Sequence, residues 1–304
     1  MEMKIPSNII VKSIYQHTFN LLKPNYFQQV QEKIMDYIKE NEKNCDYLEI
    51  EAKFGIFCFQ GSGVKELSKI EETFLIPETI QKQGDSYYEF KAGLRPDNFY
   101  LIWNAVEKES KLNGSNIDLL GTFISKDIVY NTNKRKSIMF HEGRVINEET
   151  IRKEDKRQIN VRNFGNDFRI TCCKEMPTEV IESDKEDSVR EKFRVSYQLS
   201  FFRVDFTISK DSKNNYAYEI EIELNQLKTE LKKKPINYKT IFLILDRFIQ
   251  NVHNLYSVLI PRATYENYLA NERNGYDIGE NKHFRPEEIG NIWGNYFKNN
   301  LIHK

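Results

Sequence analysis

The strongest constraint on the fold is a run in which glutamate alternates with apolar residues. Residues 218–225 read Tyr-Glu-Ile-Glu-Ile-Glu-Leu-Asn, which puts Glu219, Glu221 and Glu223 on one face of a β-strand. Neighbours on that face lie only about 7 Å apart, because a strand rises about 3.3 Å per residue. Three carboxylates at this spacing repel one another unless cations lie among them. The run therefore predicts a strand with one apolar face and one face that gathers positive charge.

The same alternation recurs in four other segments, and charge is sorted by strand. The ionisable faces carry Glu49, Glu51 and Lys53 in 47–55, Arg190, Lys192 and Arg194 in 190–197, Arg203, Asp205 and Thr207 in 202–208, and Arg169 and Glu175 in 167–175. An antiparallel sheet with one face in water explains any single strand of this kind. Two carboxylate-rich strands together with a basic strand instead favour a site in which one wall binds a metal and the other binds phosphate.

These segments predict a mainly β fold with flanking helices (α+β), in which the antiparallel strands close into a barrel. Closure would place the charged faces inside, away from bulk water. Candidate strands occupy 47–59, 122–130, 135–140, 167–174, 190–199, 201–209 and 217–226, and helical stripes run along 27–38 and 241–252. A further strand is expected within 143–160, where the register is ambiguous.

We expect one domain over 1–304. It comprises a helical N-terminal part (1–45), the barrel strands (47–226), and a bracing helix with a C-terminal tail (236–304).

Composition argues against several classes of protein. The 45 basic and 45 acidic residues give a formal net charge of zero, which argues against a general nucleic-acid coat. The four cysteines lack Cys-x-x-Cys spacing and nearby histidines, so no zinc site is expected. No apolar run approaches the ~20 residues of a membrane span, so we expect a soluble intracellular protein with no membrane partner.

The charged faces carry the residue types that hydrolysis of a phosphoanhydride requires. Carboxylate oxygens without histidine or thiol are the ligands of a hard cation such as Mg²⁺ or Mn²⁺. Lysine and arginine neutralise phosphate oxygens, and arginine can engage two of them at once. The reaction then needs mainly positioning, charge neutralisation at the transferred phosphoryl group and an oriented water.

The charged segments also resemble those of a known family. Residues 49–55, Glu-Ile-Glu-Ala-Lys-Phe-Gly, resemble the first-strand signature of the yeast-type mRNA-capping RNA triphosphatases, which are triphosphate tunnel metalloenzymes. Residues 219–223 resemble the last-strand signature of that family, and 190–197 and 203–207 look like its two central phosphate-side strands. Residues 167–177 are similar to the strand that supplies a catalytic glutamate, and 125–130 and 135–137 complete the series. The resemblance implies that the expected barrel is a triphosphate tunnel.

The resemblance implies a role for each matching residue. The metal ligands would be Glu49, Glu51 and Glu223. The catalytic group would be Glu175, which positions or activates the attacking water, with Lys192 and Arg194, which hold the γ-phosphate. Further phosphate contacts would come from Arg135, Arg169, Lys53 and Arg190, and support of the tunnel wall from Asp127, Arg203, Asp205, Thr207, Glu219 and Glu221. Simple cross-strand ion pairing is the alternative for the supporting residues.

The expected activity is metal-dependent hydrolysis of 5′-triphosphate RNA to diphosphate RNA and phosphate, the first step of mRNA capping. The chain has no Lys-x-Asp-Gly motif, so guanylyl transfer would belong to a separate guanylyltransferase. The alternatives are a tunnel enzyme that hydrolyses inorganic tripolyphosphate or free nucleotides, and a non-catalytic phosphate-binding module. A capping role implies the nucleus, a cytoplasmic setting is equally compatible, and the sequence leaves a homodimer open.

Overall fold

A computed structural model describes residues 26–60, 74–75, 82–83, 86–141, 143–162, 167–233 and 235–257. Residues 1–25 and 258–304, which belong to the expected N-terminal part and C-terminal tail, lie outside the described residues. The helices are α1 (Tyr26–Glu40), the 3-10 helix η1 (Glu42–Tyr47), α2 (Pro96–Ser110), α3 (Leu227–Lys232) and α4 (Tyr238–Ser257). The strands are β1 (Leu48–Gln60), β2 (Phe74–Leu75), β3 (Lys82–Gln83), β4 (Ser86–Ala92), β5 (Ile117–Tyr130), β6 (Lys134–His141), β7 (Arg144–Arg162), β8 (Asp167–Pro177), β9 (Glu186–Leu199), β10 (Phe202–Asp211) and β11 (Tyr216–Glu223).

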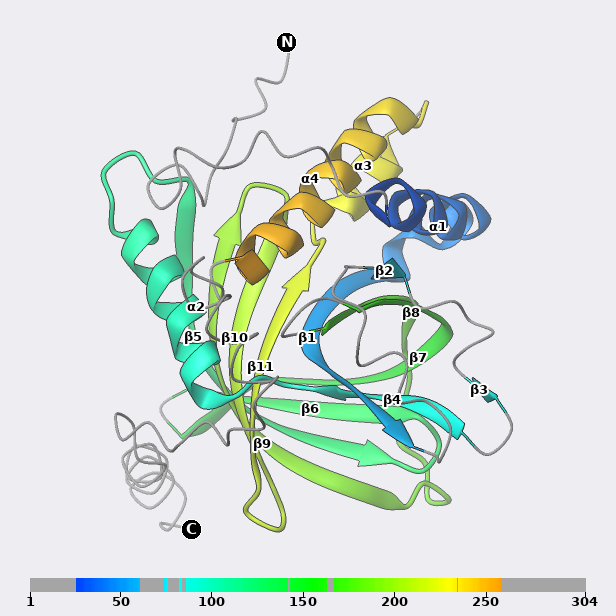
Figure 1. Ribbon diagram of the computed structural model, residues 1–304. Coiled ribbons are helices and arrows are strands. Elements are labelled where there is room, and N and C mark those ends of the chain that lie inside the picture. The colour runs from blue at the N-terminus through cyan, green and yellow to red at the C-terminus, as the bar shows by residue number, and fades with distance from the viewer. Residues whose placement is uncertain are drawn as a thin grey trace.

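Eight of the described strands close into an antiparallel barrel (Figure 1). The order around the ring is β11-β10-β9-β5-β6-β7-β8-β1, and β1 closes the ring by pairing with β11. In the closing pair, Glu51 lies opposite Glu223 and Lys53 lies opposite Glu221. The first and last alternating segments of the sequence are therefore direct neighbours, and the predicted closed barrel with flanking helices is confirmed.

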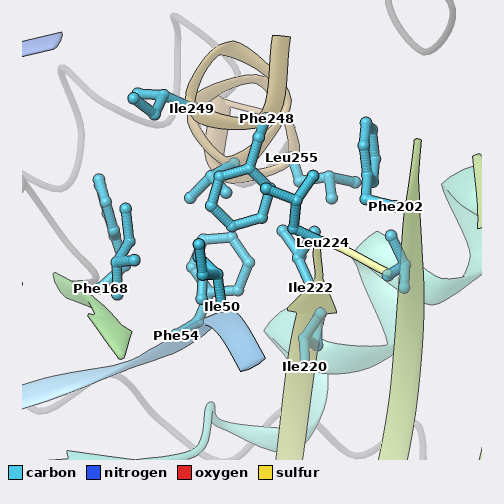
Figure 2. Close-up of a cluster of buried hydrophobic side chains, with 14 of the residues drawn as sticks. Ile50, Phe54, Phe168, Phe202, Ile220, Ile222, Leu224, Phe248, Ile249 and Leu255 are labelled. Carbon is cyan, nitrogen blue, oxygen red and sulfur yellow. The ribbon is translucent and has the colours of Figure 1, made fainter. Parts of the chain in front are cut away.

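The apolar core lies outside the barrel, between the outer faces of the strands and the helices (Figure 2). In this cluster Phe248 and Leu255 of α4 lie close to Ile50 of β1 and Ile222 of β11. Each of these four side chains is no more than 1% exposed. Since the apolar residues of each strand are used on the outside, the polar residues that alternate with them face the lumen.

Helix α2 was not predicted from the sequence. It begins with Pro96 in its first turn, and it buries Phe99, Ile102 and Val106 completely. The ring of Phe99 packs edge-on against Phe206 of β10, with 5.8 Å between the ring centroids. Phe99, Ile102 and Val106 are spaced by three and four residues, which is the helical signal that reveals α2 in the sequence. Among the described helices, none combines the length and apolar character needed to cross a bilayer.

Strand β7 resolves the ambiguous register of 143–160. A bulge between Glu154 and Arg157 interrupts its pairing with β8, and Asp155 there adopts a φ of 47°. An extra residue in one strand reverses the in–out alternation beyond it. As a result Lys153 faces the lumen, whereas Arg157 lies outside, with its guanidinium carbon 5.2 Å from the centroid of the Tyr37 ring.

Strand β1 changes partner at Gly55. Up to Lys53 it pairs with β11, and from Gly55 onward it pairs with β4 instead. A methyl group on Gly55 would lie 2.7 Å from the Phe90 ring and closer still to the carbonyl oxygen of Lys91. The glycine therefore permits the close approach of β4 at the point where β1 leaves the closed ring.

Replacing Gly55 with alanine should therefore destabilise the protein. We expect a loss of about 1–3 kcal/mol in the free energy of unfolding, because backbone and a packed ring must both shift. Urea unfolding of Gly55→Ala measures this loss. The neighbouring change Ile56→Val, at a side chain that is 46% exposed, should stay within about 0.5 kcal/mol of the wild type. Equal stability of Gly55→Ala and the wild type would show that β4 does not approach β1 in this way.

The loop between β8 and β9 is fixed to the β5–β6 turn through Asp184. The carboxylate of Asp184 accepts hydrogen bonds from Lys134 Nζ at 2.8 Å and from Thr132 Oγ1 at 2.6 Å. It also accepts one from the backbone N–H of Ile181 at 2.8 Å. These donors lower the pKa of Asp184 to about 2. The loop between β8 and β9 is thus held against one end of the barrel.

The lowered pKa of Asp184 predicts a pH dependence of stability. A carboxyl whose folded pKa is below its ordinary value stabilises the fold above the ordinary value, about 3.9. That contribution is lost as the pH falls from about 4 toward 2. We expect the thermal midpoint of the wild type to fall more steeply over this range than that of Asp184→Asn. Parallel curves for the two proteins would contradict the assignment.

Candidate active site

The polar faces of the barrel strands meet in the lumen and bring the predicted site residues together. They are Glu49, Glu51 and Lys53 on β1, Asp127 on β5, Arg135 on β6, Arg169 and Glu175 on β8, Arg190, Lys192 and Arg194 on β9, Arg203, Asp205 and Thr207 on β10, and Glu219, Glu221 and Glu223 on β11. Residues as far apart in the sequence as Glu49 and Glu223 therefore line the same lumen.

Lys153 is the centre of an acidic group. Its Nζ lies 2.7 Å from Glu49 Oε2 and 3.6 Å from Glu51 Oε1. The same nitrogen lies 3.3 Å from Glu175 Oε1, which also accepts a hydrogen bond from the Arg135 guanidinium at 3.2 Å. Although burial alone would lower it, the carboxylates of Glu51 and Glu49 raise the pKa of Lys153. A fixed positive charge therefore lies among three carboxylates.

Glu223 belongs to a second ion-pair group. Arg203 Nη2 lies 2.5 Å from Glu223 Oε2, and Arg203 Nε lies 3.0 Å from Asp205 Oδ1. Asp205 is 1% exposed and also lies 3.2 Å from Arg194 Nη1. One face of β10 thus connects the acidic strand β11 to the basic strand β9.

Lys53 and Arg194 both hold Glu221. Lys53 Nζ lies 2.6 Å from Glu221 Oε1, and Arg194 Nη2 lies 3.3 Å from Glu221 Oε2. Burial acts in the opposite direction, but Lys53 and Arg194 keep the pKa of Glu221 well below its usual value. Arg194 Nε also donates to Thr207 Oγ1 at 3.3 Å, so its guanidinium is fixed by three side chains. Glu221 is therefore an anion that orients basic groups.

The other basic side chain of the wall, Lys192, is held by Asp127. The Lys192 Nζ lies 2.6 Å from Asp127 Oδ2, and Ser137 Oγ donates to Asp127 Oδ1 at 2.9 Å. Lys192 and Asp127 are 7% and 4% exposed, so the pair is out of bulk water. Nearby, Arg135 Nε is buried and has no hydrogen-bond partner among the residues that the structure describes. The basic wall thus contains a donor that is available to a bound anion.

Arg169 and Arg190 differ from the other predicted basic residues. Arg169 Nε donates to Asn160 Oδ1 at 2.7 Å, and its guanidinium lies over the rings of Phe90 and Phe57. Arg190 is exposed on the lumen-facing side of β9, opposite Asp127 and Asp211 in register. Neither arginine forms a salt bridge within the part of the chain that the structure describes.

Burial opposes the ionisation of two of the carboxylates expected to bind metal, Glu51 and Glu223. Burial raises the pKa of Glu51, and the charge of Glu49 adds to the effect. Burial likewise raises the pKa of Glu223 against the opposing charge of Arg203. A divalent cation would stabilise the ionised forms, so this oxygen-rich donor set fits Mg²⁺ or Mn²⁺.

Basic side chains occupy the carboxylates that are expected to bind metal. Within the described residues, no three His, Cys, Asp or Glu side chains converge closely enough to hold a metal ion. Lys153 contacts Glu49 and Glu51, and Arg203 contacts Glu223. A metal ion would therefore have to replace these contacts.

The barrel has counterparts among solved structures. A structure of the S. pombe Pct1 RNA triphosphatase aligns with a TM-score of 0.61 at 15% identity, over 83% of this chain and 98% of that one. A structure of S. pombe Pct1 RNA triphosphatase in complex with the Spt5 CTD aligns with a TM-score of 0.62 at 16% identity, over 77% and 95% of the two chains. The chain has the fold of the Pct1 RNA triphosphatase.

The fold implied by the sequence resemblance is thereby confirmed. No protein-family model matches the chain, and no curated protein matches its sequence. At 15–16% identity the similarity to Pct1 extends to the fold, so the chemistry must come from this chain's own lumen residues.

Three lumen residues that contact the predicted site were not predicted from the sequence. Lys153 lies in the bulged strand, and no alternation pattern across 143–160 could place it. Cys173 donates from Sγ to Glu49 Oε2 at 3.1 Å, and Asn160 orients Arg169. The parity of Cys173 with Arg169 and Glu175 on β8 is the signal that locates it in the lumen.

Proposed function

We propose that this protein is a divalent-metal-dependent RNA 5′-triphosphatase that releases the γ-phosphate of 5′-triphosphate RNA. The observation that carries the proposal is the closure of the barrel over two charged walls. Glu49, Glu51 and Glu223 come from the adjoining strands β1 and β11. Basic side chains of β6 and β9 supply the other wall. The fold shared with an RNA triphosphatase supports the choice of substrate.

In this proposal the metal is held by Glu49, Glu51 and Glu223. Glu51 and Glu223 are direct partners across the β1–β11 pair, and Glu49 lies two residues earlier on the same face of β1. A bound Mg²⁺ or Mn²⁺ supplies charge neutralisation at the oxygens of the transferred phosphoryl group. The carboxylates become available when Lys153 and Arg203 give up their present contacts.

The terminal phosphate is bound by Arg135, Lys192 and Arg194. Within the described segments Arg135 Nε is buried without a hydrogen-bond partner, and a phosphate oxygen would satisfy it. Arg194 and Lys192 are held by carboxylates, which keeps their donors oriented before the substrate arrives. A preorganised set of this kind stabilises the charge that develops during phosphoryl transfer.

Glu175 orients the attacking water. Its Oε1 accepts hydrogen bonds from Arg135 and lies close to Lys153, so the carboxylate is fixed beside the proposed phosphate position. A carboxylate there can accept a proton from the water as the water attacks the γ-phosphorus in line with the leaving oxygen. The product would be diphosphate-ended RNA, which a separate guanylyltransferase would then use in capping.

A substrate panel tests the proposal. The purified full chain is incubated with γ-labelled 5′-triphosphate RNA, with ATP and with tripolyphosphate, each in Mg²⁺, in Mn²⁺ and in chelator. We expect metal-dependent release of the γ-phosphate alone from RNA. Activity confined to tripolyphosphate or ATP would assign the lumen to the other enzyme class. Absence of hydrolysis with all three substrates would leave only a phosphate-binding module.

A further inference from the structure

Arg169 is a half-buried cation that forms no salt bridge with a carboxylate within the described part of the chain. Six other lumen cations each lie within 4.0 Å of a carboxylate oxygen; they are Lys53, Arg135, Lys153, Lys192, Arg194 and Arg203. Burial lowers the pKa of Arg169 to about 10, and no acidic group among the described residues opposes the effect. The guanidinium is still charged at neutral pH, so it can form a charge-assisted hydrogen bond with a bound anion.

The Arg169 side chain is held in one orientation. Its Nε donates to Asn160 Oδ1 at 2.7 Å. Its guanidinium carbon lies 4.5 Å from the centroid of the Phe90 ring and 5.7 Å from that of Phe57. The two rings lie 4.9 Å apart, and Phe57 is 4% exposed. The terminal nitrogens of the guanidinium have no hydrogen-bond partner among the described residues, while its flat face is covered by the rings.

Arg169 lies where the closed ring ends. It is the cross-strand partner of Lys53, the last residue of β1 that pairs with β11. The supporting rings belong to the stretch of β1 and β4 beyond that point, which is visible where β1 bends away to run beside β4 (Figure 1). Arg169 is therefore a residue of the mouth of the lumen.

Arg169 lies far along β8 from Glu175, which marks the proposed reaction centre. Arg169 and Glu175 are six residues apart on one strand, which corresponds to about 20 Å. A triphosphate group whose terminal phosphate lies beside Glu175 is shorter than this. The anion that reaches Arg169 therefore belongs to the part of the substrate that follows the triphosphate.

We propose that Arg169 binds the first phosphodiester group of an RNA substrate and thereby favours polynucleotide ends over free nucleotides. The inference rests on the proposed triphosphatase function and deepens it. A base would need an exposed aromatic face at this position, and the guanidinium already covers the rings, so the backbone is the group recognised. ATP and tripolyphosphate have no phosphodiester group and cannot use the contact.

Steady-state kinetics of Arg169→Gln test the inference with the same three substrates. We expect the KM for 5′-triphosphate RNA to rise about tenfold or more, since hydrogen bonds to charged groups contribute strongly to binding. The KM values for ATP and tripolyphosphate should stay within about twofold of the wild type, and kcat should change little, because the contact is remote from the reacting phosphate. The slope of log KM for RNA against log salt should fall by about 0.7 in magnitude.

Two further variants separate charge from structure. Arg169→Lys keeps the charge and should recover part of the affinity for RNA. Arg157→Gln is the matched control, because Arg157 also lies over an aromatic ring but on the outside of the barrel, where it pairs with Glu40. We expect wild-type kinetics for this control with every substrate. A thermal midpoint measured for each variant checks that the fold is retained.

Several results would overturn the inference. An equal rise in KM for all three substrates would make Arg169 a general triphosphate ligand, and no change for any of them would make it structural. If the wild type hydrolyses nothing, the proposed function fails, and direct binding decides the inference. Fluorescence anisotropy with a short single-stranded RNA should then show weaker binding to Arg169→Gln than to Arg157→Gln. Equal binding would refute the role of Arg169.

Discussion

Replacing Glu49 and Glu223 together with glutamine should abolish metal-dependent phosphate release from 5′-triphosphate RNA. Both side chains keep their size, but two of the three carboxylates proposed to bind the metal lose their charge. Metal-ion stabilisation of a phosphoryl transition state is worth several kcal/mol. Since about 1.4 kcal/mol corresponds to a factor of ten, we expect kcat/KM to fall by about a thousandfold or more. Release of labelled phosphate at saturating Mn²⁺ measures the loss.

The control for this double variant is Glu154→Gln. Glu154 lies on the neighbouring strand β7, where it pairs with Arg152 away from the lumen. Loss of this surface pair should leave activity within about twofold of the wild type, because exposed ion pairs contribute little. Full activity of the double variant would show that neither carboxylate holds a metal that the reaction needs.

Replacing Lys153 with methionine should separate metal binding from catalysis. The ammonium group lies among Glu49, Glu51 and Glu175, where it competes with a divalent cation for the same carboxylates. Without it, we expect Mn²⁺ to bind about tenfold more tightly, since an opposing positive charge has been removed. Phosphate release should nevertheless fall about a hundredfold, because the Glu175 carboxylate loses a group that positions it.

Calorimetric titration with Mn²⁺ and kinetics of the same samples measure the two effects of Lys153→Met. Lys174→Met serves as the matched control, because Lys174 lies on β8 and pairs with Asp155 outside the lumen. Weaker Mn²⁺ binding by Lys153→Met would mean that the lysine supports the metal site rather than competing for it.

The strands and their charged faces could be predicted because alternation is a local property. In β1 and β11 the apolar residues lie on the outer face as predicted, with Ile50, Ala52, Ile220 and Ile222 each at most 1% exposed. Alternation within a strand does not determine which strands pair with each other in the sheet. Glu51 meets Glu223 through a strand pair that joins segments from opposite ends of the barrel sequence, and only the family resemblance placed them together.

The parts that escaped prediction have specific physical causes. A single bulge at Asp155 reverses the alternation in β7, so the pattern places Lys153 and Arg157 on one face although the structure places them on opposite faces. The orientation of Arg169 depends on Phe90, which lies on β4, a strand that pairs with the end of β1 and with β3. Non-local contacts of this kind leave no period in the sequence.

The most direct test of the two-walled lumen is to locate the metal and the phosphate by diffraction. Crystals of the full chain would be grown with Mn²⁺ and tripolyphosphate, and data collected at the manganese absorption edge. We predict an anomalous peak among Glu49, Glu51 and Glu223, with a terminal phosphate that contacts Arg135, Lys192 and Arg194. A manganese peak outside the lumen, or a phosphate bound away from these three basic residues, would contradict the account.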